Sequence, residues 1–233
     1  ANADYVPPYG SGASLYLRPI AFGTTPVVGV KPAIDYEFRL FATPVGPYFK
    51  GGMKPIRLRL SLLDRAAPHG TGHIKAGLNY AMSLYNIVDA HKNGYDENIY
   101  LDSATRTYVE ETGGANLIFV DKNGTVVTPL SDTILPSITR RSLMELAAAL
   151  GFKAETRRVR ADELGNFVCA GLCGTAAVIS PIGSIDTPDG TITYGSGEND
   201  VIHTLYNTLR AIQLGKLTRV GDLDVSSWVH EVR

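Results

Sequence analysis

Alternating hydrophobic and polar positions predict strands in the first part of the chain. Apolar residues occupy every second position from Ile56 to Leu62, with Arg and Ser between them. This period of two is typical of a strand with one buried face. A shorter strand over residues 15–20 is expected to stop at Pro19, because proline has no N–H for a sheet ladder. Residues 36–43 are a further candidate strand.

A helical period covers residues 80–92, and Asn93-Gly94 supplies its stop. Its apolar face consists of Ala81, Leu84, Tyr85 and Val88. Four more strand segments follow, at 99–101, 107–109, 117–120 and 125–128. Between the last two, the sequence Asp-Lys-Asn-Gly at 121–124 favours a hairpin turn.

Two later segments also have helical spacing. One ends at Gly151 and begins at a cap that is either Ser137 or Thr139. The other runs from about Asn199 to Leu214, before Gly215. Their apolar positions are Leu143, Leu146, Ala147 and Leu150 in the first, and Val201, Leu205, Leu209 and Ile212 in the second. Together these elements predict one α/β unit with many antiparallel hairpins.

Composition and charge exclude several classes of function. The chain of 233 residues has 22 Lys and Arg against 23 Asp and Glu, so no broad basic surface for nucleic acid is expected. No apolar stretch approaches the roughly 20 residues of a membrane span. The spacing of Cys169 and Cys173 fits neither a zinc site nor a redox pair, so both are interpreted as small buried apolar residues. With no metal-binding histidine pattern either, we expect no metal and a reducing, cytoplasmic setting.

One lysine is notable for its context. Lys75 lies in the glycine-rich segment 69–80, just before the first helix. A desolvated lysine there would be a nucleophilic amine that forms Schiff bases. The alternative is an exposed lysine in a loop.

Three other segments offer complementary chemistry. Residues 135–141 open the second helix with hydroxyl side chains, which suits an anion or simply caps the helix. The small residues of 171–177 let the backbone approach a ligand, or form a packed turn. Residues 110–116 bring carboxylates that either pair with a protonated ring nitrogen or end an exposed hairpin. An amine, an acid and phosphate donors are the three groups that pyridoxal phosphate requires.

Six motifs carry a family resemblance. In chain order they are Ser-Leu-Tyr-Leu-Arg-Pro (14–19), Val-Gly-Pro-Tyr-Phe (45–49), Lys-Ala-Gly-Leu-Asn-Tyr (75–80), Glu-Thr-Gly-Gly-Ala-Asn (111–116), Ile-Leu-Pro-Ser-Ile-Thr-Arg (134–140) and Gly-Thr-Ala-Ala (174–177). With them the chain resembles the fold-type IV pyridoxal-phosphate enzymes, and most closely the branched-chain amino-acid aminotransferases. The resemblance implies an α/β large domain, a pseudo-barrel of mostly antiparallel strands with surrounding helices.

The resemblance also implies roles for individual residues. Lys75 matches the lysine that holds pyridoxal 5'-phosphate as an internal aldimine and moves the substrate proton. Glu111 matches the carboxylate on the pyridine nitrogen, and Tyr80 the tyrosine at the phenolic oxygen. The implied cofactor-binding residues are Lys75, Tyr80, Glu111, Ser137, Ile138, Thr139, Gly174 and Thr175. The implied substrate-binding residues are Tyr16, Arg18, Val30, Thr175 and Ala176. Val30 resembles a loop residue that closes the neighbouring subunit's pocket, which implies a homodimer.

The implied reaction transfers the amino group of leucine, isoleucine or valine to 2-oxoglutarate. The alternatives are D-amino-acid transamination or aminodeoxychorismate lysis on the same fold, or a catalytically silent dimerisation domain. Residues 1–13 are expected to be an interdomain linker and 14–233 the large domain, with the family's smaller N-terminal domain outside this chain. Gly77-Leu78-Asn79 replaces the family's Gly-Gly-Asn, and Gly114 replaces a hydroxyl residue. Ala177 and Ser180 replace a cysteine pair, so thiol regulation by that route is not expected.

Overall fold

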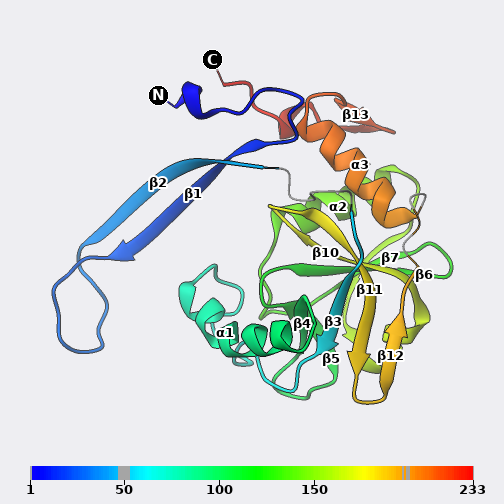
Figure 1. Cartoon of the computed structure of the whole chain (residues 1–233), viewed down its shortest axis with the longest axis horizontal. Coiled ribbons are helices and arrows are strands. Elements are labelled where there is room, and N and C mark those ends of the chain that lie inside the picture. Colours follow the sequence, from blue (N-terminus) through cyan, green and yellow to red (C-terminus); the bar gives the residue numbers. More distant parts are fainter. Residues whose placement is uncertain (1, 47–52, 196, 198–199, 233) are drawn as a thin grey trace. The chain divides into compact units, whose positions relative to one another are not determined.

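The computed structural model describes residues 2–46, 53–195, 197 and 200–232, drawn in colour in Figure 1. It separates into two compact units, Ala1–Lys50 and Gly51–Arg233, which are described one at a time. The last three residues of the motif at 45–49 and the expected helix start at Asn199 lie outside the described residues. Within the described ranges, no helix is long and apolar enough to cross a membrane.

The first unit is a long β-hairpin that follows a short 3-10 turn at Ala3–Tyr5. Strand β1 (Ser14–Gly23) pairs antiparallel with β2 (Tyr36–Val45) along its whole length, and Pro19 lies opposite Leu40. The expected stop at Pro19 is therefore wrong. A strand in a two-stranded sheet has one unpaired edge, where a residue without an N–H is tolerated.

The second unit is built on one large mixed sheet (Figure 1). Its strands are β3 (Ile56–Leu60), β4 (Glu97–Leu101), β5 (Tyr108–Thr112), β6 (Asn116–Asp121), β7 (Val126–Pro129), β8 (Ala154–Arg157), β9 (Val159–Arg160), β10 (Phe167–Gly174), β11 (Val178–Thr187) and β12 (Gly190–Thr193). The order is β8-β7-β6-β10-β11-β3-β4-β5-β9, and β12 pairs with β11. Among these described strands, β3 runs parallel to β4 and β11, and β7 runs parallel to β8; the other pairs are antiparallel. Strands β5 and β6 also contact each other, although they stand far apart in the order, so the sheet curls. The expected α/β fold with mostly antiparallel strands is confirmed.

Strand β6 shows why the centre of this sheet is apolar on both faces. Ile118 and Val120 belong to one hydrophobic cluster, and Leu117 and Phe119 belong to another on the opposite face. Successive side chains of a strand point to opposite faces, so a strand covered on both sides needs apolar residues throughout. The Phe119 ring stacks on Phe167 with centroids 4.8 Å apart.

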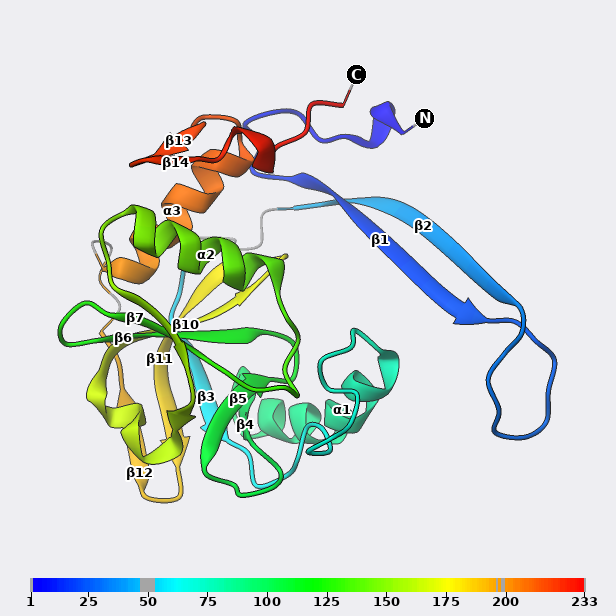
Figure 2. The same ribbon diagram turned by 180° about the vertical axis from the view of Figure 1, so that it is seen from behind.

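Helices α2 (Ile138–Ala149) and α3 (Val201–Gln213) cover the first of these clusters (Figure 2). Their buried apolar residues are Leu143, Leu146 and Ala147 in α2, and Ile202, Leu205, Leu209 and Ile212 in α3. Ser137 caps α2, and the Asp200 carboxylate caps α3 by accepting the His203 N–H. Gly151 and Gly215 follow the two helices with φ of +88° and +69°, a conformation that favours glycine. Both predicted helices are confirmed here. Beyond α3, β13 (Arg219–Val220) pairs with β14 (Leu223–Asp224), and a short 3-10 turn follows at Ser226–Trp228. Another 3-10 turn, Ala161–Asn166, lies between β9 and β10.

Helix α1 (Gly77–Lys92) packs the other way round. Its buried residues are Asn79, Ser83, Asn86 and Ala90. The predicted apolar face is exposed, with Tyr85 78% and Leu84 58% accessible. Asn86 explains the inversion, because its amide donates to Ser61 Oγ (2.7 Å) and to the hydroxyl of the buried Tyr100 (3.0 Å). A buried amide with several partners fixes the orientation of a helix as firmly as an apolar stripe does.

Candidate active site

Lys75 lies in an ordered loop that enters α1. The Asn79 amide, in the first turn of the helix, donates to the carbonyl oxygens of Thr71 and Ile74, each at 2.8 Å. These two bonds close the loop directly before Lys75. Lys75 itself is exposed, as in the alternative left open by the sequence, and its Nζ donates to the Tyr80 hydroxyl at 2.9 Å. The amine and the phenol that the motifs indicate are therefore adjacent.

Glu111, at the end of β5, is a buried carboxylate with only 5% of its surface exposed. Oε1 accepts the Leu135 N–H at 3.1 Å and lies 3.2 Å from the Arg65 guanidinium. Oε2 accepts the Asn116 amide at 2.5 Å. Burial raises the pKa of Glu111 to about 7, against the lowering effect of Arg65 and the Leu135 N–H. The alternative of an exposed acidic hairpin end is wrong for this residue.

Two glycines bring the lysine segment against the glutamate segment. A Cβ atom at Gly72 would overlap the Thr133 carbonyl oxygen and lie 2.8 Å from an Arg65 nitrogen. At Gly113, in the turn after β5, a Cβ would lie 3.5 Å from Ser83 Oγ on the buried face of α1. The loop before Lys75 and the helix after it thus both pack on the groups around Glu111.

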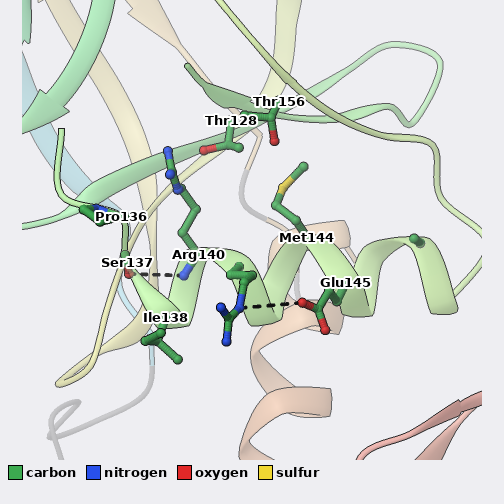
Figure 3. Close-up of a pocket in the computed structure, with 10 residues that line it drawn as sticks. Thr128, Pro136, Ser137, Ile138, Arg140, Met144, Glu145 and Thr156 are labelled. Atoms are coloured by element: carbon green, nitrogen blue, oxygen red, sulfur yellow. Dashed lines mark hydrogen bonds and ion pairs between the residues drawn. The ribbon is translucent and has the colours of Figure 1, made fainter. Parts of the chain in front are cut away.

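The start of α2 lies beside the same carboxylate, because Leu135 leads directly into it. The Ser137 hydroxyl accepts the Arg140 N–H at 3.2 Å, so its side chain does cap the helix (Figure 3). Among the described residues, the backbone N–H groups of Ile138 and Thr139 have no partner. Free N–H groups at a helix start suit an anion. A hollow of about 440 Å³ adjoins this turn, and none of Lys75, Glu111 or Thr175 lines it, so it is not assigned the chemistry (Figure 3).

The turn after β10 meets the other segments through sheet register. Cys173 pairs with Asn116, and a Cβ at Gly174 would lie 4.0 Å from that of Ala115. The next two residues, Thr175 and Ala176, are exposed at the tip of the turn. The structure therefore brings four predicted segments of the second unit together: those of Lys75, Glu111, the start of α2 and Gly174.

The remaining predicted residues belong to the first unit. Tyr16 and Arg18 lie on β1, and the Arg18 guanidinium stands 5.1 Å from the centre of the Tyr16 ring. Val30 lies in the loop between the hairpin strands and is fully exposed. Since the hairpin is described by itself, the roles of these three residues in a substrate pocket remain predictions.

Sequence reasoning assigned no role to three residues that hold the site: Arg65, Asn79 and Asn116. Asn79 and Asn116 lie inside motifs, but the sequence does not show which carbonyl or carboxylate oxygen the amide of an asparagine contacts. Arg65 follows a strand with no distinguishing pattern. Burial is the signal that identifies it, because an arginine with 4% exposure needs an anionic partner.

The two cysteines are buried thiols, as expected. Burial raises the pKa of Cys169 to about 11 and that of Cys173 to about 12, so both stay protonated near neutral pH. No group of three metal-ligating side chains occurs within the part of the chain that the structure describes.

The donor set fits a polar ligand with an aldehyde, a ring nitrogen and a phosphate. Lys75 offers the amine, Glu111 the acid, and the start of α2 the anion donors. Two buried atoms beside Glu111, Arg65 Nε and Asn116 Oδ1, have no hydrogen-bond partner in the described chain. Unpaired buried polar atoms are costly, and they are common where a ligand or water completes a site.

Comparison with known proteins places this arrangement in a family. The family model of class IV amino-transferases matches residues 4–185. The branched-chain-amino-acid aminotransferase of Helicobacter pylori (strain J99) is 45% identical over 235 residues, covering 100% of this chain and 67% of the relative.

Solved structures agree. The branched-chain aminotransferase of Thermoproteus uzoniensis with norvaline superposes with a TM-score of 0.76 at 31% identity, covering 87% of this chain and 65% of that one. The T.th. branched-chain amino acid aminotransferase complexed with N-(5'-phosphopyridoxyl)-L-glutamate gives 0.76 at 30% identity, covering 88% and 66%. The chain thus spans about two thirds of the length of these relatives. It belongs to the class IV aminotransferases and, within them, to the branched-chain aminotransferases.

Proposed function

We propose that this protein transfers the amino group of branched-chain L-amino acids to 2-oxoglutarate, with pyridoxal 5'-phosphate as cofactor and Lys75 as the residue that binds it covalently. The observation that carries the proposal is the buried Glu111 carboxylate, held beside both the lysine segment and the start of α2. A carboxylate at this place keeps a ring nitrogen protonated. When bound, the cofactor supplies an electron sink for the electrons left at the substrate α-carbon.

The chain's own residues divide the work. The Lys75 amine attaches the cofactor and then carries the proton to and from the substrate α-carbon. The Tyr80 hydroxyl, 2.9 Å from Lys75 Nζ, holds that amine and the phenolic oxygen of the ring. The Glu111 carboxylate would accept a hydrogen bond from the protonated ring nitrogen and so keep that proton on the ring. These roles need fixed side chains. The two hydrogen bonds from the Asn79 amide fix the loop before Lys75, and the bonds from Asn116 and Leu135 fix the Glu111 carboxylate.

Binding of the phosphate and the substrate completes the proposal. The free N–H groups of Ile138 and Thr139, with the Thr139 hydroxyl, Ser137 and the Gly174-Thr175 turn, bind the phosphate. The exposed turn at Thr175-Ala176 binds the substrate carboxylate through its backbone N–H groups. Complexes of the relatives with norvaline and with a phosphopyridoxyl glutamate support the choice of substrates and of cofactor.

The hairpin unit belongs to the same proposal. Tyr16 and Arg18 line the side-chain pocket, and Val30 reaches the site of a second copy in a homodimer. The hairpin loop exposes several apolar side chains, Val28, Val30 and Ile34, and such a group supports a partner surface. The two buried, free cysteines support a reducing compartment, so we place the reaction in the cytoplasm.

A substrate panel tests the proposal. The protein is incubated with pyridoxal phosphate, 2-oxoglutarate and one donor at a time, and glutamate formation is measured. We expect turnover of L-leucine, L-isoleucine and L-valine but not of D-alanine. Lys75→Ala should abolish turnover, and the matched change Lys92→Ala, at the exposed far end of α1, should leave it unchanged.

The alternatives give different results. Turnover of D-alanine without L-leucine would replace the proposal with D-amino-acid transamination. Release of pyruvate from aminodeoxychorismate would indicate the lyase. If pyridoxal phosphate causes no saturable absorption change, the chain is a silent domain and the proposal fails.

A further inference from the structure

Asn116 occupies a central place among the groups around Glu111. Its side chain is buried, with 3% exposure, at the first position of β6. One N–H of its amide donates to Glu111 Oε2 at 2.5 Å, and the amide also donates to the Leu135 carbonyl oxygen at 3.2 Å. Both partners are acceptors, so a flipped amide would place its oxygen against two other oxygens. The orientation of the amide is therefore fixed.

Leu135 closes this arrangement into a ring. Its N–H donates to Glu111 Oε1, and its carbonyl accepts from Asn116. The backbone of Leu135 thus contacts the Glu111 carboxylate twice: directly through its N–H, and indirectly through the Asn116 amide. Two residues later Ser137 caps α2. Asn116 also pairs across the sheet with Cys173, the residue before Gly174. Asn116 consequently joins the carboxylate to the start of α2 through its side-chain amide, and its backbone lies opposite the residue that precedes Gly174.

A glutamate carboxylate on its own is a poorly directed group. Rotation about its last torsion is broad and nearly free. Catalysis needs a group held to within about 0.5 Å of its working position. Arg65 and Leu135 both contact Oε1, which leaves Oε2 to Asn116. The Asn116 bond is thus the contact that sets the rotation of the carboxylate plane.

We propose that Asn116 is a positioning residue: its amide holds the Glu111 carboxylate in the direction from which it meets the cofactor ring nitrogen and keeps it in register with the start of α2. The inference rests on the proposed function. It also has a consequence in the protein without cofactor, because a donor to Oε2 stabilises the charged carboxylate.

The other charged groups that face Glu111 set the background for a test. Burial raises the pKa of Glu111 and Glu110 adds to this, whereas Arg65, the Leu135 N–H and Arg140 lower it, and the result is about 7. The buried Cys173 thiol, paired opposite Asn116, stays protonated. Removal of the Asn116 amide takes away a donor and leaves these groups in place, so the pKa of Glu111 should rise further.

The experiment uses Asn116→Ala and the matched control Asn123→Ala, an exposed asparagine in the turn that follows β6. The first readout is the pKa of the Glu111 carboxyl in the cofactor-free protein, followed by carbon NMR and assigned with Glu111→Gln. Asn116→Ala should raise it by about one unit or more. Asn123→Ala should leave it unchanged. An unchanged pKa in Asn116→Ala would overturn the inference.

The second readout is a double-mutant cycle on kcat. If Asn116 acts through Glu111, Asn116→Ala should lower kcat about tenfold or more in the wild-type background, with little change in KM. In the Glu111→Gln background the same substitution should change kcat less than about twofold, because residues that act as a unit are not additive. An equal loss in both backgrounds would mean a merely structural role and would overturn the inference.

Two controls keep the outcomes separate. If Asn116→Ala does not fold, Asn116→Ser replaces it, since its hydroxyl keeps a donor but shortens the reach. A smaller pKa rise and a smaller loss of kcat are then expected, and no change in either would contradict the inference. If wild-type protein neither binds pyridoxal phosphate nor transaminates, the proposed function fails. Normal wild-type activity with an unchanged pKa in Asn116→Ala would overturn only the role of Asn116.

Discussion

Helices α1 and α3 both pack on the second unit, but α1 buries a mainly polar face and α3 buries an apolar one. Helix α3 buries Leu205 and Leu209 in a cluster with residues of the sheet, and its fully buried residues are all apolar. Helix α1 buries Asn79 and Asn86 and leaves Tyr85 exposed. Helix α3 is held by burial of apolar area, and helix α1 is held by directed hydrogen bonds. Helix α1 also carries Tyr80 and begins directly after Lys75 and Ala76.

The difference separates stability from function within one fold. Apolar packing is non-directional, so α3 stays attached even if it shifts slightly. Hydrogen bonds from Asn79 and Asn86 act only at defined distances, and they place the start of α1 within those limits. The buried ion pair of Arg65 and Glu111 belongs to the same region. We call α1 with these groups the polar side of the unit, and α3 with its hydrophobic cluster the apolar side. We therefore expect core substitutions near α3 to change stability, and substitutions around α1 to change pH dependence and chemistry.

The largest effect on stability should come from Leu205→Ala. Leu205 is fully buried, so the change removes apolar contacts and leaves a cavity. Leu→Ala substitutions in cores cost about 2–5 kcal/mol of unfolding free energy. Urea unfolding followed by circular dichroism measures the difference. A loss below about 1 kcal/mol would mean that α3 does not depend on apolar packing.

The next effect is pH dependence from the polar side. The pKa of Glu111 is raised from 4.5 to about 7. Because the folded value exceeds the unfolded one, the stabilising contribution of Glu111 is complete below about pH 4.5 and is lost as the pH rises through about 7, up to about 3 kcal/mol. Urea unfolding of wild type and Glu111→Gln at several pH values between about 4.5 and 8 tests the sign.

The glutamine variant should lack this slope. A smaller slope should persist in both proteins from Glu97, whose pKa burial also raises. Leu205→Ala, on the apolar side, should keep the wild-type slope. Parallel pH profiles for wild type and Glu111→Gln would contradict the assignment of the slope to Glu111.

Asn86→Ala should have an intermediate effect. It leaves the hydroxyl of Tyr100, which is fully buried, without the Asn86 amide as its partner. A buried polar group without a partner costs about 1–3 kcal/mol. The same urea titration measures this loss. If Asn86→Ala were neutral while Leu205→Ala was not, hydrogen bonds would not be what holds α1.

The smallest effect should come from Leu84→Ala, the matched partner of Leu205→Ala. Leu84 is 58% exposed on α1, and surface substitutions away from special features change stability by no more than about 0.5 kcal/mol. Unfolding at the same protein concentration as for Leu205→Ala makes the pair comparable. A cost as large as that of Leu205→Ala would show that the exposed face of α1 is covered in solution.

The two sides also differed in how well the sequence predicted them. The helical spacing in 143–150 and 201–212 identified α2 and α3 and most of their buried residues, because burial there follows hydrophobicity; Leu150 is exposed and Val201 is half-buried. The same rule found α1 but chose the wrong face, since the buried amide of Asn86 outweighs the apolar residues opposite. Pro19 misled in a similar way, because its effect depends on which edge of β1 is paired. Motif order indicated Lys75, Tyr80 and Glu111. Arg65 acts through a contact with a segment far along the chain, and the partners of the Asn116 amide depend on how the turn between β5 and β6 folds.

The proposed function depends first on covalent binding of the cofactor by Lys75, in a site built around Glu111. The most direct measurement is to add pyridoxal phosphate, reduce with borohydride, and map the modified peptide by mass spectrometry. We expect the cofactor mass on the peptide that contains Lys75, its absence in Lys75→Ala, and its retention in Lys92→Ala. Stoichiometric modification of another lysine, or an undiminished yield in Lys75→Ala, would contradict it.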